Sequence, residues 1–312
     1  MMGLARLLVL GNLNLDLGVG DIPAWPTPGT ESLGHWSIFR TGGSAGNTAL
    51  AAASLGVPVE LHAAVGDDPL GGWILRSLSE AGVDCTAVRR LPAPTAFSFS
   101  VTHPGGERTF FSSAGHLPFQ GVGDEERILE APSGSVVIAC GYHLLPRWRA
   151  GALQRLFSGC RERGLVTVLD TGWPPGGQFD RQELQQVLQE TDLFLPNADE
   201  AKLVTGAPTL EHALRGLDAW VPAAVVKDGP HGAWVVERGR LVHVPVEPSE
   251  PRETVGAGDA FNAAFLYARF FRGLDLEPAV AFGVEAARLA LLSDPRRYPA
   301  TDEVVRAMGR RA

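Results

Sequence analysis

The stretch Glu253-Thr254-Val255-Gly256-Ala257-Gly258-Asp259-Ala260-Phe261 is the most informative segment of this chain. Its three small residues predict a tight turn, and the spacing of Phe261, Phe265 and Leu266 predicts that an amphipathic helix follows. A glycine-rich turn at the start of a helix directs several backbone N–H groups toward one point, and the helix dipole adds positive potential there. The segment therefore predicts an anion-binding site at the start of a helix.

Asp259 lies directly beside this turn. A carboxylate next to a bound anion is electrostatically unfavourable unless it has a chemical task. Taking the proton from a hydroxyl that attacks a bound phosphate is such a task. The alternative is that Asp259 is only the N-cap of the helix. The residues of this segment alone leave both interpretations open.

The composition limits the class of protein. With 312 residues, 45% hydrophobic and 20% charged, the chain can form one large domain with a smaller attachment. Its net charge of −8 argues against nucleic acid as the main partner, and no stretch reaches the roughly 18 apolar residues that span a membrane. Three cysteines without a C-x-x-C pair predict neither disulfides nor a zinc site, so we expect a cytoplasmic protein.

Short apolar runs alternate with longer segments of helical periodicity. The runs predict a hairpin at 234–244 and buried strands at 7–10, 59–64, 136–139, 166–169, 193–195 and 223–226. Helices are predicted at 47–55, 70–81, 151–163, 181–190, 198–205, 259–271 and 278–292. This alternation predicts an α/β fold with a mainly parallel sheet covered by helices on both faces.

Two segments, about 15–39 and 95–113, interrupt this rhythm. The first is rich in glycine and proline, and in the second the residues 97–101 alternate with period two. A turn at 103–106 follows, and strand character resumes at 108–111. We expect these segments to form a small antiparallel β lid inserted into a single domain that spans residues 1–312.

Two common nucleotide motifs, the P-loop and the G-x-G-x-x-G fingerprint, are absent from the sequence. A second glycine-rich turn runs from Gly42 and Gly43 into a helix that carries Asn47. The two glycines allow a ligand to approach the backbone closely, and Asn47 can both donate to and accept from a hydroxyl. The alternative is a tight turn in which Asn47 is a local cap. Asp16 is a candidate for holding two sugar hydroxyls, although a single Asp in a loop is more often solvated.

Asn197 and Glu200 follow the apolar strand 193–195 and share one face of a helix. Their oxygens are suited to a hydrated magnesium ion, but the same spacing is that of a capping box. The segment from Lys227 through Gly229 to Gly232 follows another strand. It suits either the edge of a nucleotide or a simple turn into the next strand.

In this order, the motifs resemble the ribokinase-like (PfkB) family of carbohydrate and nucleoside kinases over nearly the whole chain. Four segments carry the resemblance, namely 42–56, 66–84, 197–200 and 253–259. The resemblance implies a three-layer α/β domain with a β lid that often doubles as a dimer interface. It also implies ATP and Mg²⁺ as cofactors, and a K⁺ requirement in some members.

The resemblance assigns roles by position. Asp259 is the expected catalytic base, and the backbone of Gly256, Ala257 and Gly258 the expected anion hole. Asp16, Gly42, Gly43 and Asn47 are the expected sugar ligands, and Asn197 and Glu200 are expected to act on magnesium through water. Along ATP we expect Asn197, Lys227, Gly229, Gly232, Thr254 and Val284, with the stretch 281–284 at the adenine.

The chain departs from the family pattern at three places. Glu253 replaces the usual Asp, which puts the monovalent-cation site in doubt. Gly141-Tyr142-His143 occupies a stretch where many members carry a substrate-side Glu, and Lys227 replaces a frequent Thr. The substrate-side contact of that Glu is therefore not expected here.

We therefore expect an ATP-dependent kinase that phosphorylates a primary hydroxyl of a ribose-like or fructose-like sugar and forms a homodimer through the lid. A nucleoside is the second choice of substrate. A phosphorylated sugar needs a further cationic cluster, for which Arg40 and Arg108 are candidates. A catalytically silent sugar-binding relative, and a hydroxymethylpyrimidine or pyridoxal kinase without the two-segment lid, remain as alternatives.

Overall fold

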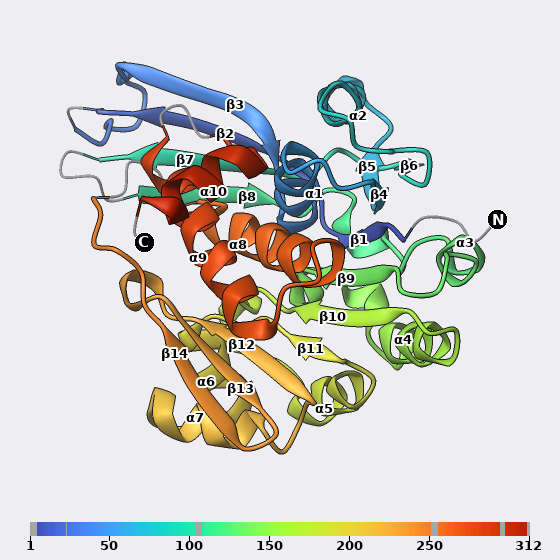
Figure 1. The fold of residues 1–312 in the computed structure, drawn as a ribbon. Coiled ribbons are helices and arrows are strands. Elements are labelled where there is room, and N and C mark those ends of the chain that lie inside the picture. The colour runs from blue at the N-terminus through green and yellow to red at the C-terminus, as the bar shows by residue number, and fades with distance from the viewer. Residues whose placement is uncertain (1–4, 23, 104–107, 251–254, 294–296, 311–312) are drawn as a thin grey trace.

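The computed structural model describes residues 5–22, 24–103, 108–250, 255–293 and 297–310, and within them an eight-stranded sheet forms the centre (Figure 1). Six consecutive strands of this sheet pair in parallel, and the remaining two strands at one edge pair antiparallel. In spatial order the sheet consists of β14 (Arg240–Val244), β13 (Ala233–Glu237), β12 (Ala223–Lys227), β11 (Leu193–Phe194), β10 (Val166–Asp170), β9 (Val136–Cys140), β1 (Leu7–Gly11) and β4 (Val59–His62).

Strand β1 is buried on both faces. Leu7 and Val9 belong to one hydrophobic core, Leu8 and Leu10 belong to the other, and all four side chains are fully buried. Successive side chains of a strand point to opposite faces, so a sheet between two helical layers requires an uninterrupted apolar run. This is why short apolar runs predicted the parallel strands correctly.

Helices cover both faces of the sheet and complete the predicted three layers. The core on one face includes residues of α1 (Ser44–Ser54), α2 (Pro69–Glu80), α8 (Ala257–Leu266), α9 (Leu276–Leu292) and α10 (Thr301–Gly309). The core on the other face includes residues of α3 (Glu125–Leu129), α4 (Ala152–Glu162), α5 (Arg181–Gln189), α6 (Ala198–Thr205) and α7 (Leu210–Leu217).

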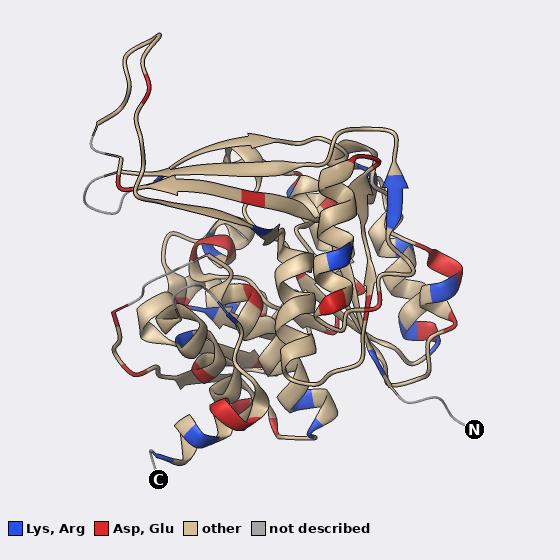
Figure 2. Ribbon diagram, turned by 90° about the horizontal axis from the view of Figure 1, so that it is seen from above, with Lys and Arg blue, Asp and Glu red and all other residues tan. Residues whose placement is uncertain are grey.

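A separate four-stranded sheet forms the lid, in the order β3 (Trp36–Gly42), β2 (Asn14–Gly20), β7 (Phe97–Thr102) and β8 (Arg108–Ser113). The outer pairs are antiparallel, as expected for the lid, whereas the central strands β2 and β7 pair in parallel. Figure 2 shows these strands as a layer along one side of the helical body. A two-stranded sheet of β5 (Ala64–Gly66) and β6 (Arg89–Leu91) lies near α2.

The predicted elements differ from the structure in a few places. The predicted strand 59–64 divides into β4 and β5, and the predicted helix 259–271 ends as α-helix at Leu266, followed by a π-helical segment, Tyr267–Phe271. Helices α3, α7 and α10 were not predicted. Among the described residues, no helix has the length and apolar character needed to cross a membrane.

Candidate active site

The glycine-rich turn lies at the start of α8, as the sequence predicts. Gly256 is the N-cap with φ of 84°, a left-handed conformation that glycine adopts with little strain. Asp259 is therefore the third residue of the helix, and the alternative that it is the N-cap is wrong. Glu253 and Thr254 lie outside the described residues, so their predicted roles remain predictions.

Asn47 and Asp259 meet although 212 positions separate them in the sequence. The Asn47 Nδ2 donates a hydrogen bond of 2.8 Å to the Asp259 Oδ2. Helix α1, whose N-cap is Gly43, packs against α8 and carries Asn47 in its first turns. The contact joins the predicted sugar site to the predicted base.

Gly42 ends β3 of the lid opposite Asn14, close to the start of α1, and Asp16 lies two residues further along β2. A Cβ atom on Gly42 would lie 2.2 Å from the Asp16 Oδ1, so only glycine leaves room for this carboxylate. The Asn14 Nδ2 donates to the Asp16 Oδ1 at 2.8 Å, and the Arg40 Nε lies 3.8 Å from the Asp16 Oδ2. Asn14 is a polar neighbour of this site that the sequence reasoning missed.

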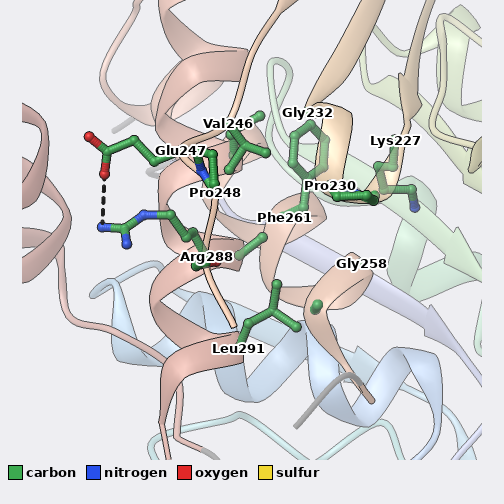
Figure 3. Close-up of a pocket in the computed structure, with 15 residues that line it drawn as sticks. Lys227, Pro230, Gly232, Val246, Glu247, Pro248, Gly258, Phe261, Arg288 and Leu291 are labelled. Carbon is green, nitrogen blue, oxygen red and sulfur yellow. Dashed lines mark ion pairs between the residues drawn. The ribbon is translucent and has the colours of Figure 1, made fainter. Parts of the chain in front are cut away.

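A cavity of about 400 Å³ opens beside the start of α8 (Figure 3). It brings together the predicted nucleotide and anion-hole residues Lys227, Gly229, Gly232, Val284, Ala257 and Gly258. Ala287 and Leu291 line the cavity on the same face of α9 as Val284. A mainly apolar cleft with a few polar groups is typical of a small-molecule site.

The other end of this cavity carries charge. Arg288 lines it and donates to both carboxylate oxygens of the fully buried Glu285, at 3.0 and 2.7 Å. Figure 3 shows the Arg288 guanidinium in an ion pair with Glu247, on the side of the pocket away from Lys227. The segment around Glu247 and the residue Arg288 were not predicted to contribute.

Asn197 and Glu200 form the capping box that was the alternative to a magnesium role. The Glu200 N–H donates to the Asn197 Oδ1 at 2.8 Å, and the Asn197 N–H donates to the Glu200 Oε2 at 2.9 Å. Burial and the nearby charge of Asp170 raise the pKa of Glu200 to about 7. Within the described ranges no cluster of three or more His, Cys, Asp and Glu side chains is arranged to hold a metal ion.

Lys227 makes its contacts beneath the cavity. Its Nζ donates to the Asp170 Oδ2 at 3.0 Å and to the Asn262 Oδ1 at 3.2 Å. Neither partner was predicted, although both had a sequence signal. Asn262 lies one helical turn after Asp259, and Asp170 directly follows the predicted strand 166–169.

Arg108 is not brought to the predicted sugar site. It pairs with Thr102, four residues further along β7 than Ser98, which pairs with Asp16. At the rise of a strand this is a separation of about 13 Å along the sheet. Of the two candidate arginines, only Arg40 lies beside Asp16 in the structure.

Comparisons with known proteins agree with this geometry. The model of the pfkB family carbohydrate kinases matches residues 21–300. Ribokinase of Bacillus subtilis (strain 168) is 28% identical over 92% of this chain and 93% of that protein. An ATP-dependent ribose-1-phosphate kinase of Halopiger xanaduensis is 29% identical over 97% of this chain and 98% of that protein.

The fold is also that of a solved ribokinase. The structure of Arabidopsis thaliana ribokinase complexed with ribose and ATP has a TM-score of 0.82 to this chain, with coverage of 97% of this chain and 98% of that one at 23% identity. The family match covers most of the chain, and the layers, lid and cavity agree with it. The chain therefore belongs to the pfkB family of carbohydrate kinases, and it is an ATP-dependent phosphotransferase with a hydroxyl acceptor.

Proposed function

We propose that this kinase transfers the γ-phosphoryl group of ATP to a primary hydroxyl of a small ribose-like or fructose-like sugar, with Asp259 as the general base. One observation carries the proposal. The Asn47 amide donates to the Asp259 carboxylate at 2.8 Å, at the helix start that borders the cavity. This contact supports a carboxylate that serves both the proposed sugar side and the proposed nucleotide side of the site.

Each group has a task in the transfer. Asp16 and Asn47 hold sugar hydroxyls, and Asp259 accepts the proton of the attacking hydroxyl as the oxygen approaches the γ-phosphorus in line. The backbone N–H groups from Gly256 to Gly258 stabilise negative charge on the transferred group, and the helix dipole supports them. Lys227, Gly229, Gly232 and Val284 line the cavity that we propose holds ATP.

Asn197 and Glu200 are suited to hold Mg²⁺ through water. Magnesium prefers oxygen ligands and keeps several of its waters, and these two side chains present oxygens at the end of β11, close to Asp170 and Lys227. When bound, the ion neutralises phosphate charge. A K⁺ site near Glu253 lies outside the described residues and enters no step.

The lid favours a sugar kinase over a hydroxymethylpyrimidine or pyridoxal kinase. A hydroxymethylpyrimidine or pyridoxal kinase is expected to lack a two-segment lid, whereas four ordered strands are present here. Intact Asp259 and its turn also argue against a silent sugar-binding relative, because binding alone needs no base. A phosphorylated sugar is a further candidate acceptor beside a nucleoside, because Arg40 adds a cation beside Asp16 and one relative is a ribose-1-phosphate kinase.

An ADP-release assay with ATP and magnesium tests the function. The acceptors are ribose, fructose, sugar acids, ribose 1-phosphate, fructose 6-phosphate and nucleosides. The proposal expects turnover with ribose or fructose to exceed turnover with every nucleoside. Selective turnover of a nucleoside or of a sugar phosphate would identify that compound class as the acceptor instead. If none of the compounds stimulates ADP release, the proposed kinase activity toward these acceptors is contradicted.

The lid also supports a homodimer. Trp36, Phe39, Phe110 and Phe111 are large apolar side chains exposed on its strands. Exposed aromatic surface of this kind is typical of an interface. Light scattering after gel filtration is expected to give the mass of two chains for the wild type and of one chain for Phe39→Asp/Phe111→Asp, and a monomeric wild type contradicts the dimer.

A further inference from the structure

A buried ion pair of Lys227 and Asp170 lies below the predicted anion-binding turn. The catalytic steps proposed above place Lys227 along ATP but give Asp170 no task. The Lys227 Nζ lies 3.0 Å from the Asp170 Oδ2, and both side chains are largely buried. Asn262 binds both partners, since its Oδ1 accepts from Lys227 and its Nδ2 donates to the Asp170 Oδ2. Three elements therefore meet at one ammonium group: the end of β10, the end of β12 and α8.

This ammonium group lies next to the predicted anion hole. A Cβ atom on Gly258 would lie 3.7 Å from the Lys227 Nζ, which is the nearest heavy atom apart from the neighbouring residues and backbone of α8 itself. Lys227 and Gly258 both line the cavity, and Figure 3 shows them on the side away from the ion pair of Glu247 and Arg288. A phosphate at the turn would lie within a few ångströms of this cation.

The surroundings keep Lys227 charged. Burial acts to lower its pKa, but the charges of Asp170 and Glu200 and the hydrogen bond to Asp170 outweigh burial and raise it. Asp259 adds a further negative charge nearby. An unpaired buried ammonium would lose its proton or leave the interior, so Asp170 is what holds a permanent cation at this point.

We propose that Asp170 is a positioning residue for phosphoryl transfer, and that it acts by holding the Lys227 ammonium beneath the Gly256–Gly258 turn as a catalytic cation. This inference rests on the proposed function. In the transfer, the bond from the γ-phosphorus to the ADP oxygen breaks, a bond to the acceptor oxygen forms, and the acceptor proton goes to Asp259. Lys227 keeps its protons and stabilises charge on the moving group.

The test compares Asp170→Asn, Lys227→Met and the double variant that carries both changes. Each single change leaves a buried charge or a polar group without its partner, so each is expected to lower the melting temperature. The double variant replaces the whole ion pair with neutral groups of similar size, and we expect it to recover most of that stability. Asp302→Asn, on the exposed surface of α10, is the control and is expected to match the wild type.

Activity separates the proposed role from a purely structural one. We expect kcat to fall roughly 10²–10³-fold in Lys227→Met, which is about the effect of removing one oxyanion donor, while the KM for ATP changes by only a few-fold. Asp170→Asn is also expected to lower kcat. The double variant is expected to have the same low kcat as Lys227→Met, although it folds stably. The proposal would be overturned if the double variant recovered wild-type kcat together with its stability. It would also be overturned if the losses of kcat in the two single variants simply added in the double variant.

A binding measurement makes the test independent of the acceptor. With magnesium and aluminium fluoride, which mimics the transferred phosphoryl group, ADP is expected to bind the wild type more tightly than ADP alone. Lys227→Met and the double variant are expected to lose this extra affinity and to keep the affinity for ADP. If no acceptor is phosphorylated but aluminium fluoride still binds in a Lys227-dependent way, the proposed acceptor is wrong. The proposed role of Lys227 as a catalytic cation is then still supported. If both variants keep the wild-type affinity for aluminium fluoride, the proposed role of Lys227 as a catalytic cation is contradicted.

Discussion

At the scale of single residues, the site depends on contacts that are close because small side chains allow them. Asp16 packs directly on Gly42, and Asp259 accepts from Asn47 at 2.8 Å. Both acids are thereby fixed by residues far from them in the sequence. The sequence and the family resemblance singled out Asp16, Gly42, Asn47 and Asp259 as candidates, and their roles in binding and catalysis remain predictions.

Gly42→Ala tests the sugar side. The added Cβ would lie 2.2 Å from the Asp16 Oδ1, so the carboxylate must move away from the position proposed to hold sugar hydroxyls. We expect the KM for the sugar to rise at least 10-fold, because a hydroxyl loses a charge-assisted hydrogen bond, with little change in the KM for ATP. Initial rates at varied sugar and varied ATP measure both constants.

Gly121→Ala is the matched control, because a Cβ at Gly121 would meet no atom within 4 Å. It is expected to leave both constants unchanged. If Gly42→Ala leaves the sugar KM at the wild-type value, Asp16 does not bind the sugar in this position.

At the scale of elements, the ends of the strands decide which residues meet. Asp170 ends β10, Lys227 ends β12, and Asn197 follows β11, which lies between them. In a parallel sheet, ligands bind beyond the carboxyl ends of the strands. The sequence located these strand ends within one or two residues, but spatial order is not written in local patterns. For that reason the contact of Asp170 with Lys227 was not predicted.

Helix α7 is a different kind of miss. Leu210, Ala213, Leu214 and Leu217 have helical spacing, and all but Leu210 are buried. Thr209 caps the helix by accepting from the His212 N–H. The signal was therefore present in the sequence. In contrast, the position of Arg108 at the far end of the lid depends on strand register, which local sequence does not determine.

The capping box of α6 gives a prediction at this scale. Asn197→Ala removes the cap of α6 and is expected to lower the free energy of unfolding by about 1 kcal/mol. Because Asn197 is also proposed to act on magnesium, the Mg²⁺ concentration for half-maximal activity is expected to rise several-fold. Urea unfolding and magnesium titration of the activity measure the two effects.

Thr209→Ala provides the comparison, since it removes a helix cap in the neighbouring α7 without a proposed metal role. It is expected to cost similar stability and to leave the magnesium requirement unchanged. An equal shift in magnesium requirement for both variants means that Asn197 acts only as a cap.

At the scale of the whole molecule, buried histidines are expected to set part of the acid sensitivity. His143 is 3% exposed, and burial, together with the charge of Arg149, lowers its pKa to about 4. Burial also lowers the pKa of His62 and of His116. Between pH 6.5 and 4 the unfolded chain binds a proton at His143 that the folded chain does not, so stability falls as the pH falls.

His143→Asn is expected to remove its share of this loss, on the order of 3 kcal/mol between pH 7 and pH 4. Urea unfolding at several pH values should show a shallower decline of the free energy of unfolding than in the wild type. His35→Asn, at an exposed position, serves as the control. A variant whose stability declines as steeply as the wild type's contradicts the assignment to His143.

The three-layer architecture itself was largely predictable, because buried strands and amphipathic helices both leave periodic patterns. The lid was predicted from the same patterns, including the alternation at 97–101. What the sequence did not reveal was its central pairing, in which β2 and β7 run parallel. That pairing joins segments about 80 residues apart and depends on how the lid is attached to the body.

The most direct test of the central claim is the turnover number of Asp259→Asn with the preferred acceptor. The account predicts a fall in kcat of roughly 10²–10⁴-fold with ATP affinity largely retained, because the amide keeps the shape of the side chain but cannot accept the proton. Asp302→Asn should turn over like the wild type. An Asp259→Asn enzyme with wild-type kcat would contradict the account, because the proton would then have another acceptor.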